Sequence, residues 1–563
     1  MKRLIGIILP VIMVLSVFAA IPLSADAYLD FEFAESGCIG NYEERPEYAY
    51  NDPKDGTNVT YTFDEASGTL TLTAHTDVSL DCRMASYHTP IFQNQNKIKH
   101  LIVNEGVTGF CVNAFAGCTE LTDVKLPSTL SELESGLFAN CTSLKEVTLK
   151  GAVTAINDDA FYNCSSLEKV TFNDKLATIA YEAFAGCESL KEIVIPKSVK
   201  EVGYYAFGAC KALKNALFKD SPASIGNSAF AGCTALESVD FGSALKELKD
   251  DVFYGCTALK SVTIPSTVKK ISEKDFSDCS ALTTVKLGEG VEIIDESAFE
   301  DCVSLKSVSL PKSLKTINDS AFRGCTSLTD ITLPEKLETL GVVAFSDCSS
   351  LKEMTVSASI KDLGKSVFMN CEGLTKFVFA DGISAIPYRY LSGCKNLKTV
   401  QIPKSVTKIE YGNFYYDSGV TDVYYGGSKE DWQKIEIEGD NYSLDSATIH
   451  YNAKAPVVKK DNPFSVTVKS KSLKAKKLKS KKQTIKPFTV KNAKTAVTFT
   501  KVKKGTTSKI YKKITVNGKT GAITFKKGKY AKKAYKVAVK ITAKGNSSYK
   551  AKTLTKTVKV KIK

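Results

Sequence analysis

The residues of this sequence with the greatest capacity for chemistry are its sixteen cysteines, which could form disulfides, bind a metal ion or supply a nucleophile. Thirteen of them recur at a constant interval of 23 residues, without a single insertion. They are Cys118, Cys141, Cys164, Cys187, Cys210, Cys233, Cys256, Cys279, Cys302, Cys325, Cys348, Cys371 and Cys394. A fixed period over so many units is typical of a repeat architecture.

This spacing predicts neither a metal site nor a catalytic nucleophile. Zinc ligands usually come two to four residues apart, whereas the closest two cysteines are Cys111 and Cys118. The four histidines lie in or beside the predicted ends of the repeat region, so none is placed as a base for a column cysteine. They are His75, His88, His100 and His450. No glycine-rich phosphate loop is present in the sequence either, and we therefore predict a protein that is not an enzyme and carries no metal or cofactor.

Disulfides within the cysteine column are also disfavoured. Neighbouring coils of a stacked repeat lie about 5 Å apart, which is within bonding distance. Coils in register, however, point their Cβ atoms in parallel, whereas a disulfide needs a dihedral angle near 90°. We predict a buried ladder of reduced thiols that pack as small apolar side chains. Cys38, Cys82 and Cys111 lie outside the column, and one pair among them could bridge the amino-terminal cap; the sequence leaves open which pair.

A second column shows which elements must position the cysteines. An aromatic or aliphatic side chain stands three residues before each column cysteine, and the same register continues for one unit at either end, which makes fifteen units. The column consists of Phe92, Phe115, Phe138, Phe161, Phe184, Phe207, Phe230, Phe253, Phe276, Phe299, Phe322, Phe345, Phe368, Leu391 and Phe414. The general unit reads A-F-x-x-C-x-x-L-x-x-V-x-L-P-x-x-L-x-x-I.

Each unit predicts one short strand and one turn. Val124 and Leu126 are two residues apart, which places both side chains on one face of a strand, and Pro127 ends that strand. Polar residues before the Ala-Phe pair, as at positions 157–159, suit the cap of a single helical or 3₁₀ turn. One such unit cannot bury its own apolar face, so the units must stack. We predict a mainly-β leucine-rich repeat solenoid of about fifteen 23-residue units, followed by a small all-β sandwich.

The amino-terminal segment predicts export. Lys2 and Arg3 precede an apolar run at 4–23, and Ala-Asp-Ala at 25–27 is a small-x-small cleavage site. An uncleaved membrane anchor is the alternative, because the run is nearly long enough to span a bilayer. With cleavage, we expect a secreted or cell-surface protein without a transmembrane anchor. The predicted segments are a signal peptide (1–27), an amino-terminal β cap (28–91), the solenoid (92–414), its carboxy-terminal cap (415–452) and a basic domain (453–563).

The repeat pattern resembles the leucine-rich repeats of BspA-like bacterial surface proteins over residues 55–452. The resemblance rests on the Ala-Phe-x-x-Cys-x-x-Leu core and on Leu-Pro-x-x-Leu turns such as Leu126 to Leu130. It also rests on a hairpin-like segment at 61–72 and on the closing segments at 423–432 and 447–451. The resemblance implies a secreted or surface-attached protein that adheres to host extracellular-matrix proteins, surface proteins or glycans, or to other bacteria.

The exposed side of the strand sheet is the predicted binding surface. The row between the inward strand residues runs Lys125, Thr148, Thr171, Val194, Leu217, Asp240, Thr263, Lys286, Ser309, Thr332, Thr355, Val378 and Gln401. Its polar members, with residues of the adjacent row, are the candidate ligand face: Asp123, Lys125, Glu146, Thr148, Lys169, Thr171, Glu192, Asp240, Thr263, Lys286, Thr332 and Thr355. Such a mixed surface suits broad contact with a protein or glycan better than a small substrate.

The composition changes abruptly past residue 452. Residues 453–563 contain 35 lysines and one acid, Asp461, which gives a charge of +34. Because the whole chain carries +15, the residues before this segment carry 15 minus 34, or −19. Alternating apolar residues and lysines, as at 536–541 and 557–562, predict strands with one charged face. A segment of this length suggests an immunoglobulin-like sandwich, and residues 543–551 resemble segments of bacterial surface Ig-like modules.

The charge distribution gives a hypothesis for the basic domain. A lysine-rich exported domain would be held on anionic envelope polymers, or on an acidic glycan, by electrostatic attraction. Nucleic acid is the rival ligand of a basic domain, but export and the lack of an aromatic-rich stacking surface argue against it. We therefore expect an adhesion or protein/glycan-binding protein; the alternative is a structural envelope component without a specific ligand.

Overall fold

The computed structural model describes residues 36–39, 59–74, 95–110, 112–220, 224–415, 419–455, 464–504, 506–544 and 549–563. The predicted signal peptide, Cys82, Cys111 and the side chain of Cys38 lie outside the described residues, so the predictions about them stay open. The chain divides into two compact units, Met1–Lys454 and Ala455–Lys563. We call them the repeat unit and the lysine-rich unit.

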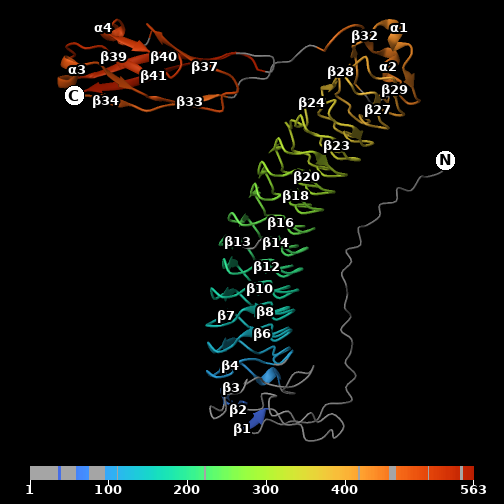
Figure 1. Ribbon diagram of the computed structural model, residues 1–563, viewed down its shortest axis with the longest axis vertical. Coiled ribbons are helices and arrows are strands. Elements are labelled where there is room, and N and C mark those ends of the chain that lie inside the picture. The colour runs from blue at the N-terminus through green and yellow to red at the C-terminus, as the bar shows by residue number, and fades with distance from the viewer. Residues whose placement is uncertain are drawn as a thin grey trace. The chain divides into compact units, whose positions relative to one another are not determined.

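The repeat unit begins on antiparallel strands. Strand β1 (Ser36–Ile39) pairs with β2 (Val59–Asp64), and β2 pairs with β3 (Thr69–Ala74). After the short 3₁₀ helix η1 (Gln95–Lys97), β4 (His100–Val103) runs parallel to β3 and starts the stack of coils (Figure 1). The hairpin thus covers the edge of the first coil, which would otherwise expose unpaired backbone groups.

Two rows of parallel strands run along the repeat unit. Successive strands pair at an offset of 23 residues, as Val262 pairs with Val285. The longer row, which we call row 1, comprises β5 (Asp123–Lys125), β7 (Glu146–Thr148), β9 (Lys169–Thr171), β11 (Glu192–Ile195), β13 (Asn215–Phe218), β15 (Ser238–Asp240), β17 (Ser261–Thr263), β19 (Thr284–Lys286), β21 (Ser307–Ser309), β24 (Glu353–Val356), β26 (Lys376–Phe379), β28 (Thr399–Ile402), β30 (Asp422–Tyr425) and β32 (Thr448–His450). This in-register stack confirms the predicted mainly-β solenoid.

The second row consists of two-residue strands on the return path of each coil. They are β6 (Glu132–Leu133), β8 (Ala155–Ile156), β10 (Thr178–Ile179), β12 (Glu201–Val202), β14 (Ser224–Ile225), β16 (Glu247–Leu248), β18 (Lys270–Ile271), β20 (Ile293–Ile294), β22 (Thr316–Ile317), β23 (Thr339–Leu340), β25 (Asp362–Leu363), β27 (Ala385–Ile386), β29 (Lys408–Ile409) and β31 (Glu436–Ile437). In most of them the second residue is buried and the first is half-exposed, so each coil is closed by one apolar side chain.

The segment around each phenylalanine forms the short turn for which the sequence predicted a single helical or 3₁₀ turn. Between residues 112 and 415, the described residues of this segment form hydrogen-bonded turns rather than a helix. The N–H of Phe161 donates to the carbonyl of Ala183 in the next coil at 2.8 Å, whereas the N–H of Tyr162 donates to Asp159 in its own coil at 2.9 Å. Asp159 has a left-handed φ of 56°. The i→i−3 bonds are those of a single 3₁₀-type turn, in line with the prediction, and they do not continue into a helix because stacking takes every second N–H away from the local turn.

The phenylalanine column forms a continuous stack inside the solenoid. From Phe115 to Phe368, successive rings lie 5.0–5.7 Å apart at interplanar angles of 17° or less. At the next coil Leu391 replaces phenylalanine, and the preceding residue, Tyr390, packs edge-on against Phe368 at 5.5 Å. These rings are buried and form the axis of the core.

The far end of the repeat unit carries two short helices, α1 (Lys429–Trp432) and α2 (Ser443–Ser446). Ser428 and Asp431 form a capping box that fixes the start of α1. The Trp432 ring packs edge-on against Tyr425 of β30 at 5.2 Å, so helix α1 is tied to the last coils.

The lysine-rich unit is β-rich and has its own apolar core. Its elements are β33 (Ser465–Val468), β34 (Lys471–Leu473), α3 (Ala475–Ser480), β35 (Gln483–Ile485), β36 (Phe488–Lys491), β37 (Val497–Val502), α4 (Ser508–Tyr511), β38 (Ile514–Val516), β39 (Ile523–Phe525), β40 (Ala534–Ala543) and β41 (Lys552–Ile562). They form sheets in the orders β34-β41-β40-β37, β35-β39-β38 and β33-β36, mostly antiparallel (red in Figure 1). The immunoglobulin-like assignment of this unit stays a prediction.

Candidate binding surfaces

The predicted ligand face lies on the outer side of row 1. Eleven of its twelve residues belong to row 1 strands, and all twelve side chains are exposed. The exception is Thr332, which lies outside any strand because the sheet is reduced to one bridge, between Ser307 and Asp330, at that coil. Stacking therefore brings residues 23 positions apart into one continuous surface on either side of this interruption.

An apolar pair within this surface is the feature that residue type alone did not single out. Val194 of β11 and Leu217 of β13 are direct partners in the sheet register. Their side chains are 37% and 40% exposed, although both are large and apolar. Glu192 and Asn215, two residues earlier on the same two strands, are also partners and flank the apolar pair. An exposed apolar pair with a polar rim is typical of the centre of a protein-binding surface.

Ion pairs join adjacent coils at several points along the repeat unit. Eight ion pairs join residues that are 23 positions apart: Lys191–Glu168, Lys211–Glu188, Lys260–Glu237, Lys269–Glu292, Lys315–Glu292, Arg323–Glu300, Lys361–Glu338 and Lys395–Glu372. The pKa of Glu292 is lowered, first of all by its hydrogen bond from Lys315. Exposed pairs of this kind add little stability, and none of the eight involves a residue of a row 1 strand.

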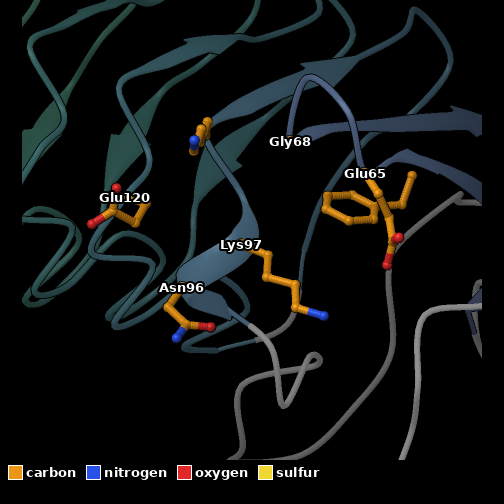
Figure 2. Close-up of a pocket in the computed structure, with 7 residues that line it drawn as sticks. Glu65, Gly68, Asn96, Lys97 and Glu120 are labelled. Atoms are coloured by element: carbon orange, nitrogen blue, oxygen red, sulfur yellow. The ribbon is translucent and has the colours of Figure 1, made fainter.

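An open depression of about 410 Å³ lies where the amino-terminal hairpin meets the first coils (Figure 2). Its lining comprises Phe63, Glu65, Gly68, Asn96, Lys97, Lys99 and Glu120. The β3–β4 pairing brings these residues together, so no motif in the sequence could have signalled them. Two carboxylates and two lysines balance each other, and the lining contains no cysteine, histidine or serine that could act as a nucleophile or base with them. The depression therefore does not point to catalysis.

The cysteine column is buried and unpaired in the structure. Twelve of the thirteen thiols donate to the carbonyl of the phenylalanine 26 residues earlier, with sulfur–oxygen distances of 3.1–3.3 Å. Cys141, for example, donates to Phe115 in the preceding coil. Burial raises the pKa of Cys164 to about 12. Each of these twelve thiols thus supplies a hydrogen bond between coils while packing as an apolar group, and the raised pKa of Cys164 makes that thiol a poor nucleophile.

We expect the column thiols to be inert in the folded protein and reactive after unfolding. Without reductant, a thiol reagent such as dithionitrobenzoate should label all thirteen in denaturant but almost none under native conditions. The reason is that burial both blocks access and suppresses the thiolate. Mass spectrometry of the labelled peptides gives the count. Labelling of fewer than half of these cysteines in denaturant would mean that they form disulfides.

One buried carboxylate interrupts the small-residue column that precedes phenylalanine. Asp275 stands where neighbouring coils have Val252 and Ala298, and it is completely buried. Its Oδ2 accepts the N–H of Ser272 at 2.7 Å, whereas its Oδ1 has no partner. Burial raises the pKa of this carboxyl well above its ordinary value, against the opposing effect of the Ser272 bond. The position therefore carries an unsatisfied polar atom inside an apolar core.

Asp275→Ala should raise the free energy of unfolding by up to about 1–3 kcal/mol at pH 7, because removing the unsatisfied buried carboxylate outweighs the loss of the bond from the Ser272 N–H. The gain should depend on pH. Since the pKa is higher in the folded state, the carboxyl is best tolerated below its unfolded value of about 3.9 and costs more as pH rises towards the folded value. Urea denaturation of both proteins from pH 4 to 8 measures the difference, which should grow with pH. A difference that shrinks with pH would contradict the prediction.

Asn413 provides the matched control, because it occupies the same column and is equally buried. Its side-chain amide donates to the carbonyls of Pro387 and Glu410 at 2.9 Å, and its oxygen accepts the N–H of Leu391 at 3.3 Å. Asn413→Ala removes all three bonds and leaves the Leu391 N–H without its acceptor, so it should lower the free energy of unfolding by about 1–3 kcal/mol. The two alanine substitutions should therefore have opposite signs.

The lysine-rich unit has a charge pattern opposite to that of the repeat unit. All 32 lysines between residues 464 and 563 are exposed or half-buried, and none is buried. The sequence contains no aspartate or glutamate in this interval. Four lysines lie over aromatic rings instead: Lys501 over Tyr511 at 4.2 Å, Lys513 over Tyr530 at 5.3 Å, Lys533 over Tyr535 at 5.6 Å and Lys552 over Phe464 at 5.7 Å. This positive charge is not balanced by carboxylate side chains of its own unit.

The described residues contain no cluster of three or more histidine, cysteine, aspartate or glutamate side chains arranged to hold a metal ion. Within the same part of the chain, no helix has the length and the apolar composition that crossing a bilayer requires.

Several solved structures are similar to this chain. A leucine-rich repeat protein from Bacteroides ovatus is 26% identical, with a TM-score of 0.47, and the match covers 65% of this chain and 98% of that one. A leucine-rich cell surface protein from Faecalibacterium prausnitzii is 22% identical, with a TM-score of 0.33 and coverage of 69% and 98%. The pneumococcal vaccine antigen PcpA is 19% identical, with a TM-score of 0.35 and coverage of 70% and 97%. No curated protein matches the chain.

The model of the BspA-type leucine-rich repeat region, which consists of six repeat copies, matches residues 87–214, 200–325 and 292–421. These matches span more than half of the 563 residues and coincide with the stacked coils of the repeat unit. The chain therefore belongs to the BspA-type leucine-rich repeat family, whose surface-type proteins act generally in protein binding or adhesion.

Proposed function

We propose that this protein is exported and acts at the cell surface as an adhesin, in which row 1 binds a protein or glycan and the lysine-rich unit holds the chain on anionic envelope polymers. The expected partners of row 1 are host extracellular-matrix or surface proteins and glycans. The observation that carries the proposal is the contrast between the two units: an exposed apolar pair and a net negative charge on one, and unbalanced lysines on the other.

The binding role of row 1 is supported by its regularity and by its composition. Parallel strands in register present a broad surface whose side chains cannot collapse onto one another, because the backbone spacing of about 4.8 Å is fixed. Val194 and Leu217, on the adjacent strands β11 and β13, add exposed apolar area to it. The depression at the amino-terminal end is open and of mixed charge, so it supports no small-substrate activity.

The retention role of the lysine-rich unit is supported by charge alone. A unit with 34 lysines and one acid between residues 455 and 563 attracts polyanions over a Debye length of about 10 Å at 0.1 M salt. A structural envelope component without a specific ligand is the alternative function. It would share the retention on anionic polymers but would show no ligand preference.

A binding array of matrix proteins and glycans, probed with the full chain, separates these functions. We expect Val194→Glu with Leu217→Glu to weaken the strongest signals about tenfold or more, because truncating or charging the apolar centre of an interface has the largest effect. The control is Val303→Glu with Val342→Glu, which alters two valines that are 39% and 40% exposed but lie on turns outside row 1. Equal signals from both variants, or no ligand preference at all, would favour the structural alternative.

A further inference from the structure

The three-stranded sheet of the lysine-rich unit carries a row of threonines on its outer face. Thr484 of β35, Thr524 of β39 and Thr515 of β38 are direct partners in the register of the three strands. Inward residues on the same strands, such as Ile523 and Phe525, are buried in the core. The alternation leaves the three hydroxyls side by side on the opposite surface.

Four lysines lie beside this threonine row, at one end of strands β35 and β39. Lys481 and Lys482 come immediately before β35, and Lys526 and Lys527 come immediately after β39. The two strands are antiparallel, with Gln483 opposite Phe525, so the start of β35 lies beside the end of β39. Both lysine pairs therefore lie at the same end of these strands. Thr515, Thr524 and the four lysines line a hollow of about 500 Å³. This size lies within the range of small-ligand sites.

We propose that this hollow, which we call the threonine–lysine site, binds a phosphodiester group of a polyol-phosphate polymer. The proposal rests on the function proposed above and specifies where the lysine-rich unit recognises its polymer. Lysine ammonium groups and hydroxyls are both donors suited to phosphate oxygens. The 500 Å³ hollow leaves room for the phosphate and the polyol carbons beside it.

The arrangement of donors favours an oxyanion. The hydroxyls of Thr484 and Thr524 lie 2.8 Å apart, so one donates to the other and the second hydroxyl hydrogen remains available. The four ammonium groups repel one another, and no carboxylate side chain between residues 464 and 563 relieves that repulsion. A bound phosphate removes it. Lysines that served only for solubility would gain nothing from being gathered around one hollow.

The lining also separates this ligand from nucleic acid. It contains no aromatic ring on which a base could stack, and stacking is a major part of single-strand binding. A polymer of phosphates joined by simple polyols needs only the charge and the hydroxyl donors that the hollow provides.

Titration calorimetry of the full chain with polyglycerol phosphate at 0.15 M salt tests the site. Variant A carries Lys481→Gln, Lys482→Gln, Lys526→Gln and Lys527→Gln. Variant B, the matched control, removes four charges from the β40–β41 face with Lys536→Gln, Lys540→Gln, Lys559→Gln and Lys561→Gln. Variant C carries Thr484→Val, Thr515→Val and Thr524→Val, which keep the strand shape and the net charge.

We expect the dissociation constant to rise about 30-fold or more in variant A. In variant B it should rise by only about threefold, because lysines outside the hollow contribute only through the general electrostatic field. Variant C should raise it about 5–10-fold, the effect of losing hydrogen bonds to a charged group. Equal losses in A and B with none in C would overturn the site while leaving electrostatic retention intact. Absence of polymer binding by the unmodified chain would instead overturn the retention function itself. Tighter binding of heparin or of oligo(dT) than of polyglycerol phosphate would overturn the phosphodiester assignment.

Discussion

Replacing Phe253 by alanine lowers the free energy of unfolding of the repeat unit by about 3–5 kcal/mol. Its ring is completely buried between Phe230 at 5.6 Å and Phe276 at 5.4 Å, and Phe241 packs edge-on against it at 5.8 Å. The coils on either side are fixed by backbone hydrogen bonds, such as that from the Phe253 N–H to the backbone carbonyl of Asp275 at 2.9 Å. They cannot close over the missing ring, so a cavity remains and the cost lies at the upper end for core substitutions.

The measurement is the urea unfolding transition of the full chain, followed by tyrosine fluorescence or circular dichroism. Tyr254→Ala is the matched control, because it removes an aromatic ring from the next residue, which is 37% exposed. It should cost less than about 1 kcal/mol. Coils in a solenoid stabilise only their neighbours. Amide hydrogen exchange should therefore increase more in residues 230–276 than at the two ends of the repeat unit. A similar cost for both variants would mean that the aromatic stack is not the main source of stability.

Binding of the full chain to polyglycerol phosphate weakens by about 10³-fold or more when salt is raised from 0.1 M to 1 M. This magnitude corresponds to about five lysine–phosphate contacts, each adding about −0.7 to the slope of log affinity against log salt, as on single-stranded polyanions. The physical cause is the release of counterions from the polymer as lysines replace them. Ion pairs on the repeat unit, by contrast, are satisfied between coils and contribute little to this slope.

Titrations at four salt concentrations give the slope of log affinity against log salt directly. Variant A should make this slope clearly shallower, and variant B should change it less. Binding that survives 1 M salt would contradict electrostatic retention and would indicate apolar contacts.

The coil architecture follows from the sequence because one period repeats without insertion. Phe253 and Cys256 recur in each neighbour at a fixed offset, so burial, register and strand direction are all implied by stacking identical units. The turn before phenylalanine could not be predicted in the same way. Local capping preferences indicate a single turn, but its alternation with bonds to the next coil, such as that from Phe161 N–H to the Ala183 carbonyl, appears only in the stacked structure.

The candidate sites also divide into features that the sequence predicts and features that only the folded chain brings together. The predicted face of row 1 was found from strand alternation, because exposure alternates along a strand of known direction. The importance of Val194 and Leu217 depends on their being both exposed and paired, which residue type does not reveal. The threonine–lysine site joins residues 481–484 to 515–527, and only the strand pairing of the folded unit brings them together. The interruption at Thr332 likewise depends on tertiary pairing.

In the proposed function, one chain performs two separate binding tasks, one on each unit. Opposite charge supports this division, with −19 on residues 1–452 and +34 on residues 453–563. If the tasks are separate, a polymer held by the lysine-rich unit leaves row 1 free for its protein or glycan partner. If they are not, the polymer and the partner compete for the same lysines.

The most direct test is surface plasmon resonance on a layer of polyglycerol phosphate, loaded first with the full chain and then with the strongest ligand from the array. We predict that the loaded chain captures the ligand, that Val194→Glu with Leu217→Glu abolishes capture but not loading, and that variant A loses loading while its ligand binding in solution is unchanged. Displacement of the chain from the layer by the ligand, or loss of ligand binding in variant A, would contradict the separation of the two tasks.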